Sequence, residues 1–247
     1  MKIQLFFLTA ILFGIVACAA ETQFRLPELK GVEAGPVKDG QEIAACAAVF
    51  PDGGYRGHGG KGGWQFVHSI DFTMRDGSGT TVIGVTSLSG NDIECALMTV
   101  EGLTLFEAVF GHDNSIEVRR AVPPFDRPGF AAGLINDIRA IFQPPPGSME
   151  TGQLQSRLQP QSPGTTAVCR YRDGSNGVVG VVDVLPEVDG CWQIKSYTSD
   201  LVMKRSITGL SCSKRGFSRI PDHILLKTYG QTGYTLKMTL ISADNLK

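Results

Sequence analysis

Few residues of this chain have the spacing that nucleophilic, metal-assisted or cofactor chemistry requires. Ser211 and Lys214 form an SxxK sequence, but its companion motifs are absent and a turn is predicted there. Gly57, Gly59 and Gly62 form a GxGxxG sequence, but a strand rather than a helix follows it, so we interpret it as a flexible loop and predict no cofactor. The histidines and cysteines lack HExxH, paired-histidine or CxxC spacing, so no metal site is predicted. The sequence therefore predicts a protein that is not an enzyme, and a hydrolase is the weakest alternative.

One histidine stands out because of the strand on which it lies. Residues 64–75 alternate between apolar and polar side chains, which predicts a long, half-buried antiparallel strand. Its apolar face carries Phe66, His68, Ile70 and Phe72. His68 is therefore either a hydrogen-bonded core histidine or a polar group that fixes a ligand headgroup inside an apolar cavity.

The beginning of the sequence has the features of a bacterial lipoprotein signal. Lys2 precedes an apolar run that is too short to span a bilayer. The sequence Ile15-Val16-Ala17-Cys18 resembles a lipobox, in which the cysteine is acylated and becomes the first mature residue. We therefore expect residues 1–17 to be a signal peptide and Cys18 to carry a lipid anchor. A plain secretory signal with an incidental cysteine is the alternative.

The rest of the sequence predicts a short tether and one mainly β domain. Residues 18–42 have little periodicity and are assigned to the tether, and residues 43–247 to the domain. Tight turns separate five expected strands, at residues 64–75, 80–88, 92–100, 103–110 and 115–122. Beyond a long loop at residues 143–165, more strands are expected at residues 166–172, 178–185, 191–198, 201–209, 223–229 and 234–241.

An amphipathic helix is expected in the middle of the chain, at residues 128–142, between two proline clusters. Its apolar stripe includes Phe130, Leu134 and Ile138. Ordinary packing of a helix on a sheet accounts for this stripe. The alternative is that the helix is a lid over an acyl-chain cavity, hinged at the flanking prolines.

Charge limits the classes of partner, and the cysteine content limits the possible disulfides. The formal net charge is −1 and the cationic residues are scattered, so we exclude nucleic acid as a partner. Five cysteines remain besides Cys18, so at least one thiol is left unpaired in an oxidising compartment. Cys191 and Cys212 are the preferred disulfide pair because they flank the open end of one predicted hairpin.

The order of these elements resembles the LolA/LolB superfamily and its lipoprotein relatives. A lipobox, a five-strand meander and a proline-bounded helix come first, and a segment beginning Ile220-Pro221-Asp222 precedes the last hairpin. The resemblance covers about residues 45–243. It implies a mainly β fold, a curved antiparallel sheet or incomplete β-barrel of about eleven strands with a central plugging helix. It also implies that the concave face binds acyl chains.

The lipobox and the resemblance together give an expected function. Alanine rather than aspartate at position 19 resembles signals that send lipoproteins to the outer membrane. We expect a lipoprotein anchored there, facing the periplasm, that binds an acyl chain, a lipid or another lipoprotein. The alternative is an assembly lipoprotein that uses the sheet to bind an envelope protein.

Overall fold

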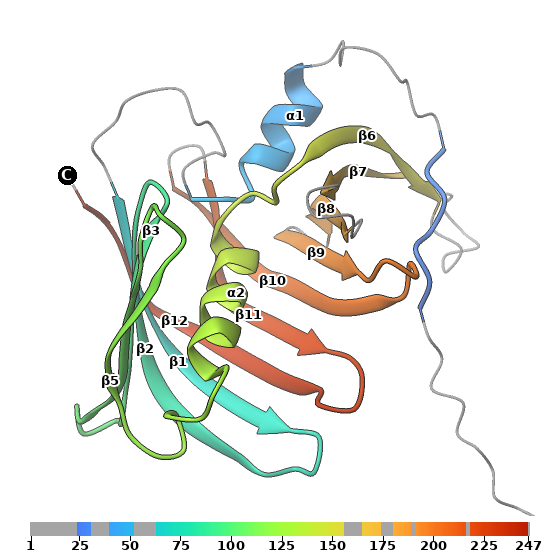
Figure 1. Cartoon of the computed structure of the whole chain (residues 1–247). Coiled ribbons are helices and arrows are strands. Elements are labelled where there is room, and N and C mark those ends of the chain that lie inside the picture. The colour runs from blue at the N-terminus through green and yellow to red at the C-terminus, as the bar shows by residue number, and fades with distance from the viewer. Residues whose placement is uncertain are drawn as a thin grey trace, which may run out of the picture.

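The chain folds, in a computed structural model, into one antiparallel sheet of twelve strands in the order β5-β4-β3-β2-β1-β12-β11-β10-β9-β8-β7-β6. The structure describes residues 24–30, 40–51, 63–155, 165–173, 180–188, 191–215 and 218–246. The sheet is unclosed and curves around helix α2 (Figure 1). The predicted fold class, a curved antiparallel sheet with a central helix, is confirmed, and the sheet has one strand more than expected.

The first five strands form the predicted meander. They are β1 (Gly63–Met74), β2 (Gly79–Ser89), β3 (Asp92–Met98), β4 (Thr104–Phe110) and β5 (Ile116–Ala121). Burial alternates along β2, β3 and β4, as expected of strands with one face against a core. In β5 nearly every residue is exposed, because this strand is one edge of the sheet.

The second half of the sheet contains seven strands. They are β6 (Ser148–Gln155), β7 (Thr165–Asp173), β8 (Gly180–Val188), β9 (Cys191–Tyr197), β10 (Met203–Arg215), β11 (Ser218–Thr228) and β12 (Tyr234–Leu246). β12 pairs along the whole of β1 and so joins the two halves. The prediction of a loop over residues 143–165 was wrong, because β6 lies within it. Its sequence is mostly polar, and it is the other edge strand of the sheet, paired along its length with β7.

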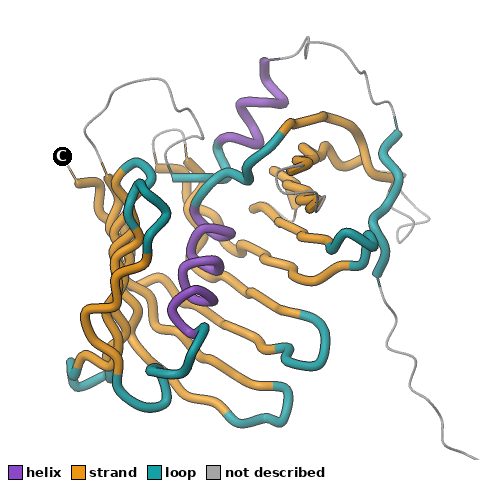
Figure 2. The backbone as a smooth tube through the Cα atoms, viewed as in Figure 1, coloured by secondary structure: helices purple, strands orange, loops and turns teal. Residues whose placement is uncertain are grey.

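Two helices cover the concave face. α2 (Phe130–Phe142) runs along the middle of that face (Figure 2), close to the predicted range. Gly129 precedes it with a φ of 82°, a left-handed conformation that glycine adopts readily. α1 (Gly40–Ala47) is joined to β7 by a disulfide between Cys46 and Cys169. Within the described ranges, neither helix is long and apolar enough to cross a membrane.

Residues 24–30, which the sequence assigns to the tether, lie against the second half of the sheet. Backbone hydrogen bonds join Phe24 and Leu26 to the turn between β9 and β10. At the other end of the segment, Lys30 pairs with Gln153 of the edge strand β6. The segment therefore connects this turn to the edge of the sheet, as its blue trace in Figure 1 shows.

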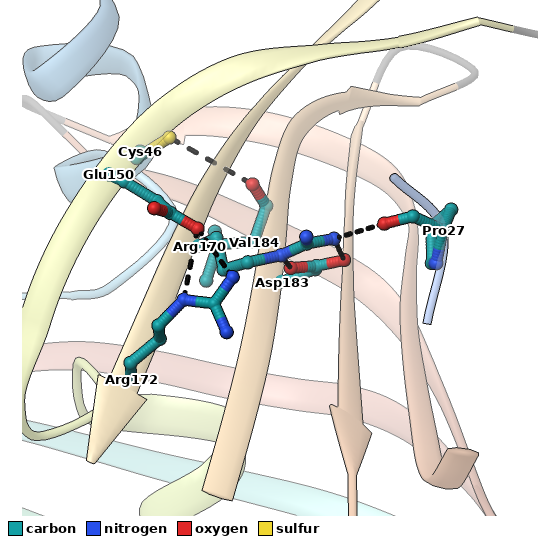
Figure 3. Close-up of polar contacts among 7 residues, drawn as sticks. All are labelled: Pro27, Cys46, Glu150, Arg170, Arg172, Asp183 and Val184. Atoms are coloured by element: carbon teal, nitrogen blue, oxygen red, sulfur yellow. Dashed lines mark hydrogen bonds and ion pairs between the residues drawn. The ribbon is translucent and has the colours of Figure 1, made fainter. Parts of the chain in front are cut away.

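A buried ion pair fixes the middle of this segment (Figure 3). Arg170 of β7 donates from Nε and Nη2 to the two carboxylate oxygens of Asp183, over 2.6 and 2.8 Å. The same Nη2 donates to the carbonyl oxygen of Pro27 at 2.9 Å. Both charged side chains are almost fully buried. A charge in this position is stabilised only when its hydrogen bonds are made, so Pro27 is part of a specific contact.

Candidate functional site

The structure brings the predicted apolar residues together between the concave face and α2. Phe66 and Ile138 are buried in the core, and the other predicted side chains pack against it: Ile70, Phe72, Phe130 and Leu134. Aromatic contacts join α2 to the meander, with Phe66–Phe142 at 4.8 Å between ring centroids and Phe106–Phe130 at 5.1 Å. Phe72 of β1 contacts Tyr234 of β12 at 5.4 Å. The layer thus continues from the meander across β1 to β12.

The void found in this layer among the described residues is small. A void of about 10 Å³ remains where Phe66, His68 and Phe142 meet Trp192 and Ile224. Such a volume holds at most one water molecule. An acyl chain therefore fits under α2 only if the helix moves away from the sheet.

His68 lies at this void without a hydrogen-bond partner among the described residues. Its side chain is 3% exposed, and its ring lies 6.1 Å from the rings of both Phe66 and Phe142. Gly84 is opposite His68 on β2 and presents no side chain there. Burial lowers the pKa of His68 to about 4, so the imidazole is neutral at pH 7. A core histidine usually has a hydrogen-bond partner, whereas His68 has none among the described residues and lines the void.

Replacing His68 by leucine is expected to remove part of the acid sensitivity of the fold. The folded-state pKa is about 4 and the ordinary value is 6.5, so the unfolded chain binds the proton first as pH falls. Stability is lost between these values, by about 2 kcal/mol from pH 7 to pH 5. Urea unfolding at both pH values measures this loss. His68→Leu should lack it and His223→Leu, at an exposed site, should retain it; equal losses would refute this assignment.

A second polar cluster holds α2 to the sheet. Asp137, on the buried face of α2, forms an ion pair with Arg205 of β10 at 2.6 Å, and Tyr234 of β12 donates a hydrogen bond to its other carboxylate oxygen. The side chains of Asp137 and Arg205 are 6% and 15% exposed. Burial raises the pKa of Asp137, and Arg205 and Tyr234 oppose that rise. We call these three residues the α2 clamp.

The sequence contains one signal for the clamp, although Asp137 is not among the predicted site residues. Asp137 lies seven residues after Phe130 and four before Ile141, so it falls on the apolar stripe of the helix. A carboxylate in that position is buried, and a buried carboxylate requires a cationic or hydrogen-bonding partner. Nothing in the sequence pattern identifies Arg205 or Tyr234 as those partners.

The remaining candidate motifs do not form a further site in the described part of the chain. Ser211 and Lys214 lie in β10 and are both exposed, whereas SxxK chemistry needs the start of a helix. The GxGxxG sequence and Cys18 lie outside the described residues. Among the described residues, no three histidine, cysteine or acidic side chains gather as a metal site.

Four cysteines are paired and one described thiol is free. Cys191 is bonded to Cys212, the pair that the sequence favoured. The second disulfide, Cys46–Cys169, was not predicted, because 123 residues separate its cysteines. Cys95 is buried in β3, and burial raises the pKa of its thiol to about 11, which makes it a poor nucleophile.

Comparison with known proteins gives similarities of fold. No family model matches the chain, and no curated protein matches it significantly. A LolA superfamily protein from Nitrosomonas europaea has 13% identity and a TM-score of 0.46, over 84% of this chain and 93% of that chain. A Vibrio parahaemolyticus domain named for outer membrane lipoprotein sorting has 7% identity and a TM-score of 0.42, over 76% of this chain and 86% of that one.

Proposed function

We propose that this chain is a non-catalytic lipoprotein, anchored through Cys18 to the outer membrane and facing the periplasm, that binds an acyl chain between α2 and the sheet. The observation that carries the proposal is the layer beneath α2. It is mainly aromatic and aliphatic, extends across both halves of the sheet, and contains His68 without a partner in the described structure. The lipobox supports the anchor, and the resemblance to the LolA/LolB superfamily supports the ligand class.

The free energies of chain burial and of opening the α2 clamp indicate how such a ligand would be held. An acyl chain that buries eight methylene groups gains about 6 kcal/mol. That gain opposes the loss of the Asp137 ion pair and hydrogen bond if the α2 clamp opens. The free energy gained from the acyl chain is too small to compensate as well for loss of the apolar contacts of α2. We therefore expect the helix to stay packed over the bound chain. His68 is then placed to hydrogen-bond an ester or amide oxygen of the ligand.

Native mass spectrometry on the mature chain tests the proposal. The Cys18→Ser protein is exported with a cleavable signal, purified without detergent and mixed with fatty acid, phospholipid or acylated peptide. We expect a mass increase from one of these ligands. Phe72→Asp should abolish uptake by placing a charge in the layer, and Ile241→Asp, at an exposed position of β12, should not. A protein that takes up none of the offered chains contradicts the proposal.

A second candidate function follows from the small void in this layer. A void of about 10 Å³ also suits a sheet that serves only as a scaffold for an envelope protein. In that case the protein takes up no acyl chain and crosslinks in cells to one specific partner. The same mass spectrometry experiment therefore distinguishes the two functions, because only the first predicts uptake of an acyl chain.

A further inference from the structure

We propose that the end of the sheet where residues 24–30 dock is a membrane-contacting surface that inserts apolar side chains into phospholipid. We call it the docking rim and define it by Phe24, Leu201 and Tyr229, which are 59%, 41% and 42% exposed. The proposal rests on the lipid anchor at Cys18 and adds the orientation in which the anchored domain meets the membrane.

The docking rim is built from neighbouring turns. Phe24 accepts a backbone hydrogen bond from Met203, directly after the β9–β10 turn that carries Leu201. Tyr229 begins the β11–β12 turn, and its backbone N–H donates to Lys204 at 2.9 Å. Figure 1 shows these two turns at the same end of the sheet, beside the N-terminal segment. The three exposed residues therefore lie in neighbouring segments at one end of the sheet, where the hydroxyl of Tyr229 is hydrogen-bonded to Ser206 at 3.1 Å.

The backbone conformation of Leu201 is unfavourable for a leucine. Its φ is 61°, in the left-handed region that glycine and asparagine adopt most easily. Thr198 holds the turn, because its carbonyl accepts from the N–H of Leu201 and its hydroxyl from that of Val202. A leucine here costs free energy through its backbone and leaves an apolar side chain in water. Residues that are strained and exposed in this way point to a binding role.

The position of the anchor indicates that the partner is a membrane. Only five residues lie between Cys18 and Phe24, and the six residue steps between these two span about 20 Å when fully extended. The contact of Pro27 with Arg170 prevents the segment from lengthening this reach by peeling away. β1 is twelve residues long, so the opposite end of the sheet lies about 40 Å away. The docking rim is thus the part of the described domain that the anchor holds closest to the lipid.

Charge around the docking rim is compatible with a phospholipid surface. Arg25 and Lys204 are exposed beside Leu201 and can meet lipid phosphates, and Asp200 in the same turn partly offsets them. Apolar insertion therefore supplies most of the attraction, and charge supplies little. This balance predicts that docking depends weakly on salt.

Tryptophan depth measurements on the anchored protein test the orientation. Lipidated Leu201→Trp and Ile241→Trp proteins are reconstituted in vesicles of phosphatidylethanolamine and phosphatidylglycerol at three to one, with brominated acyl chains as quenchers. The native Trp64 and Trp192 are buried and serve as a constant background. We expect bromine to quench Trp at position 201 about twofold or more strongly than Trp at position 241. Equal quenching at both positions would overturn the proposal.

A second measurement separates docking from the anchor. The Cys18→Ser protein partitions onto the same vesicles through the docking rim alone. Phe24→Ser combined with Leu201→Asn should weaken this partitioning about tenfold. Asparagine accepts the left-handed conformation, so the turn is retained. Ile241→Asn removes an equally exposed apolar side chain and should change nothing.

The outcomes distinguish this inference from the proposed function. Unchanged partitioning of the Phe24→Ser and Leu201→Asn protein overturns membrane docking, and so does a crosslink from position 201 to an envelope protein in place of quenching. Failure to label Cys18 with palmitate overturns the anchor and leaves the partitioning result valid. Failure of acyl-chain uptake overturns the ligand proposal and affects neither vesicle experiment.

Discussion

Asp137→Ala is expected to lower the free energy of unfolding by about 3–5 kcal/mol, the largest effect of a single substitution that we predict. Alanine leaves the Arg205 guanidinium without its counterion, in a site where the side chain is only 15% exposed. It also removes the acceptor of the Tyr234 hydroxyl. Urea unfolding monitored by circular dichroism measures the change. Because Asp137 lies on α2, we also expect faster proteolysis next to this helix.

Two control variants determine whether the cost comes from burial of the charge. Glu107→Ala breaks an exposed pair with Arg119, in which both side chains are more than 40% exposed, and should cost less than about 1 kcal/mol. Replacing both charges of the clamp, as Asp137→Leu with Arg205→Met, should restore most of the lost stability. If Asp137→Ala costs no more than Glu107→Ala, the clamp does not hold α2.

The second large effect is expected from removing the Cys46–Cys169 disulfide. Closing a loop of 123 residues restricts the unfolded chain, and its loss should cost about 5 kcal/mol when both cysteines are replaced by alanine. The disulfide also joins α1 to β7, and the chain after α1 places Phe50 in the core. We therefore expect the end of the half-barrel near α1 to open before the rest unfolds. Hydrogen exchange and urea unfolding of the double variant test both expectations.

The Cys191–Cys212 disulfide is the matched control for this experiment. It closes a loop of only 21 residues between neighbouring strands, so its removal should cost about 3 kcal/mol. Neither double substitution changes a charged residue, so electrostatic effects do not distinguish the two variants. If both double variants lose the same stability, restriction of the unfolded chain is not the main contribution of the Cys46–Cys169 bond.

The parts of the fold that sequence predicted are those in which one face is buried. β1 alternates because its inward side chains meet α2 and its outward ones meet solvent, and α2 is recognisable because prolines bound an apolar stripe. β6 could not be recognised, since most of its side chains are polar and its place depends on backbone pairing with β7 and with Lys30. Residues 24–30 also lack periodicity, because their place depends on backbone hydrogen bonds and on a carbonyl contact with Arg170.

In the candidate site, too, local periodicity was readable from the sequence and non-local contacts were not. Phe66, Phe72 and Leu134 were predicted to face one layer because strand and helix periods fix their direction. The partners of Asp137 come from strands about 70 and 100 residues away, and no local pattern encodes such distances. For His68 the sequence left two interpretations open. The structure supplies the missing observation, a buried imidazole with no partner among the described residues.

The docking of the N-terminal segment has a consequence for the order in which the protein matures. On the proposed export, Phe24 would leave the channel early, but it pairs with Met203, which would leave much later. Cys46 must likewise wait for Cys169. Such non-local contacts form slowly, so on the proposed export the chain would stay unfolded until most of it had crossed the inner membrane. On the proposed anchoring, acylation of Cys18 can precede these contacts, and the last pairings of the sheet then form beside a lipid surface.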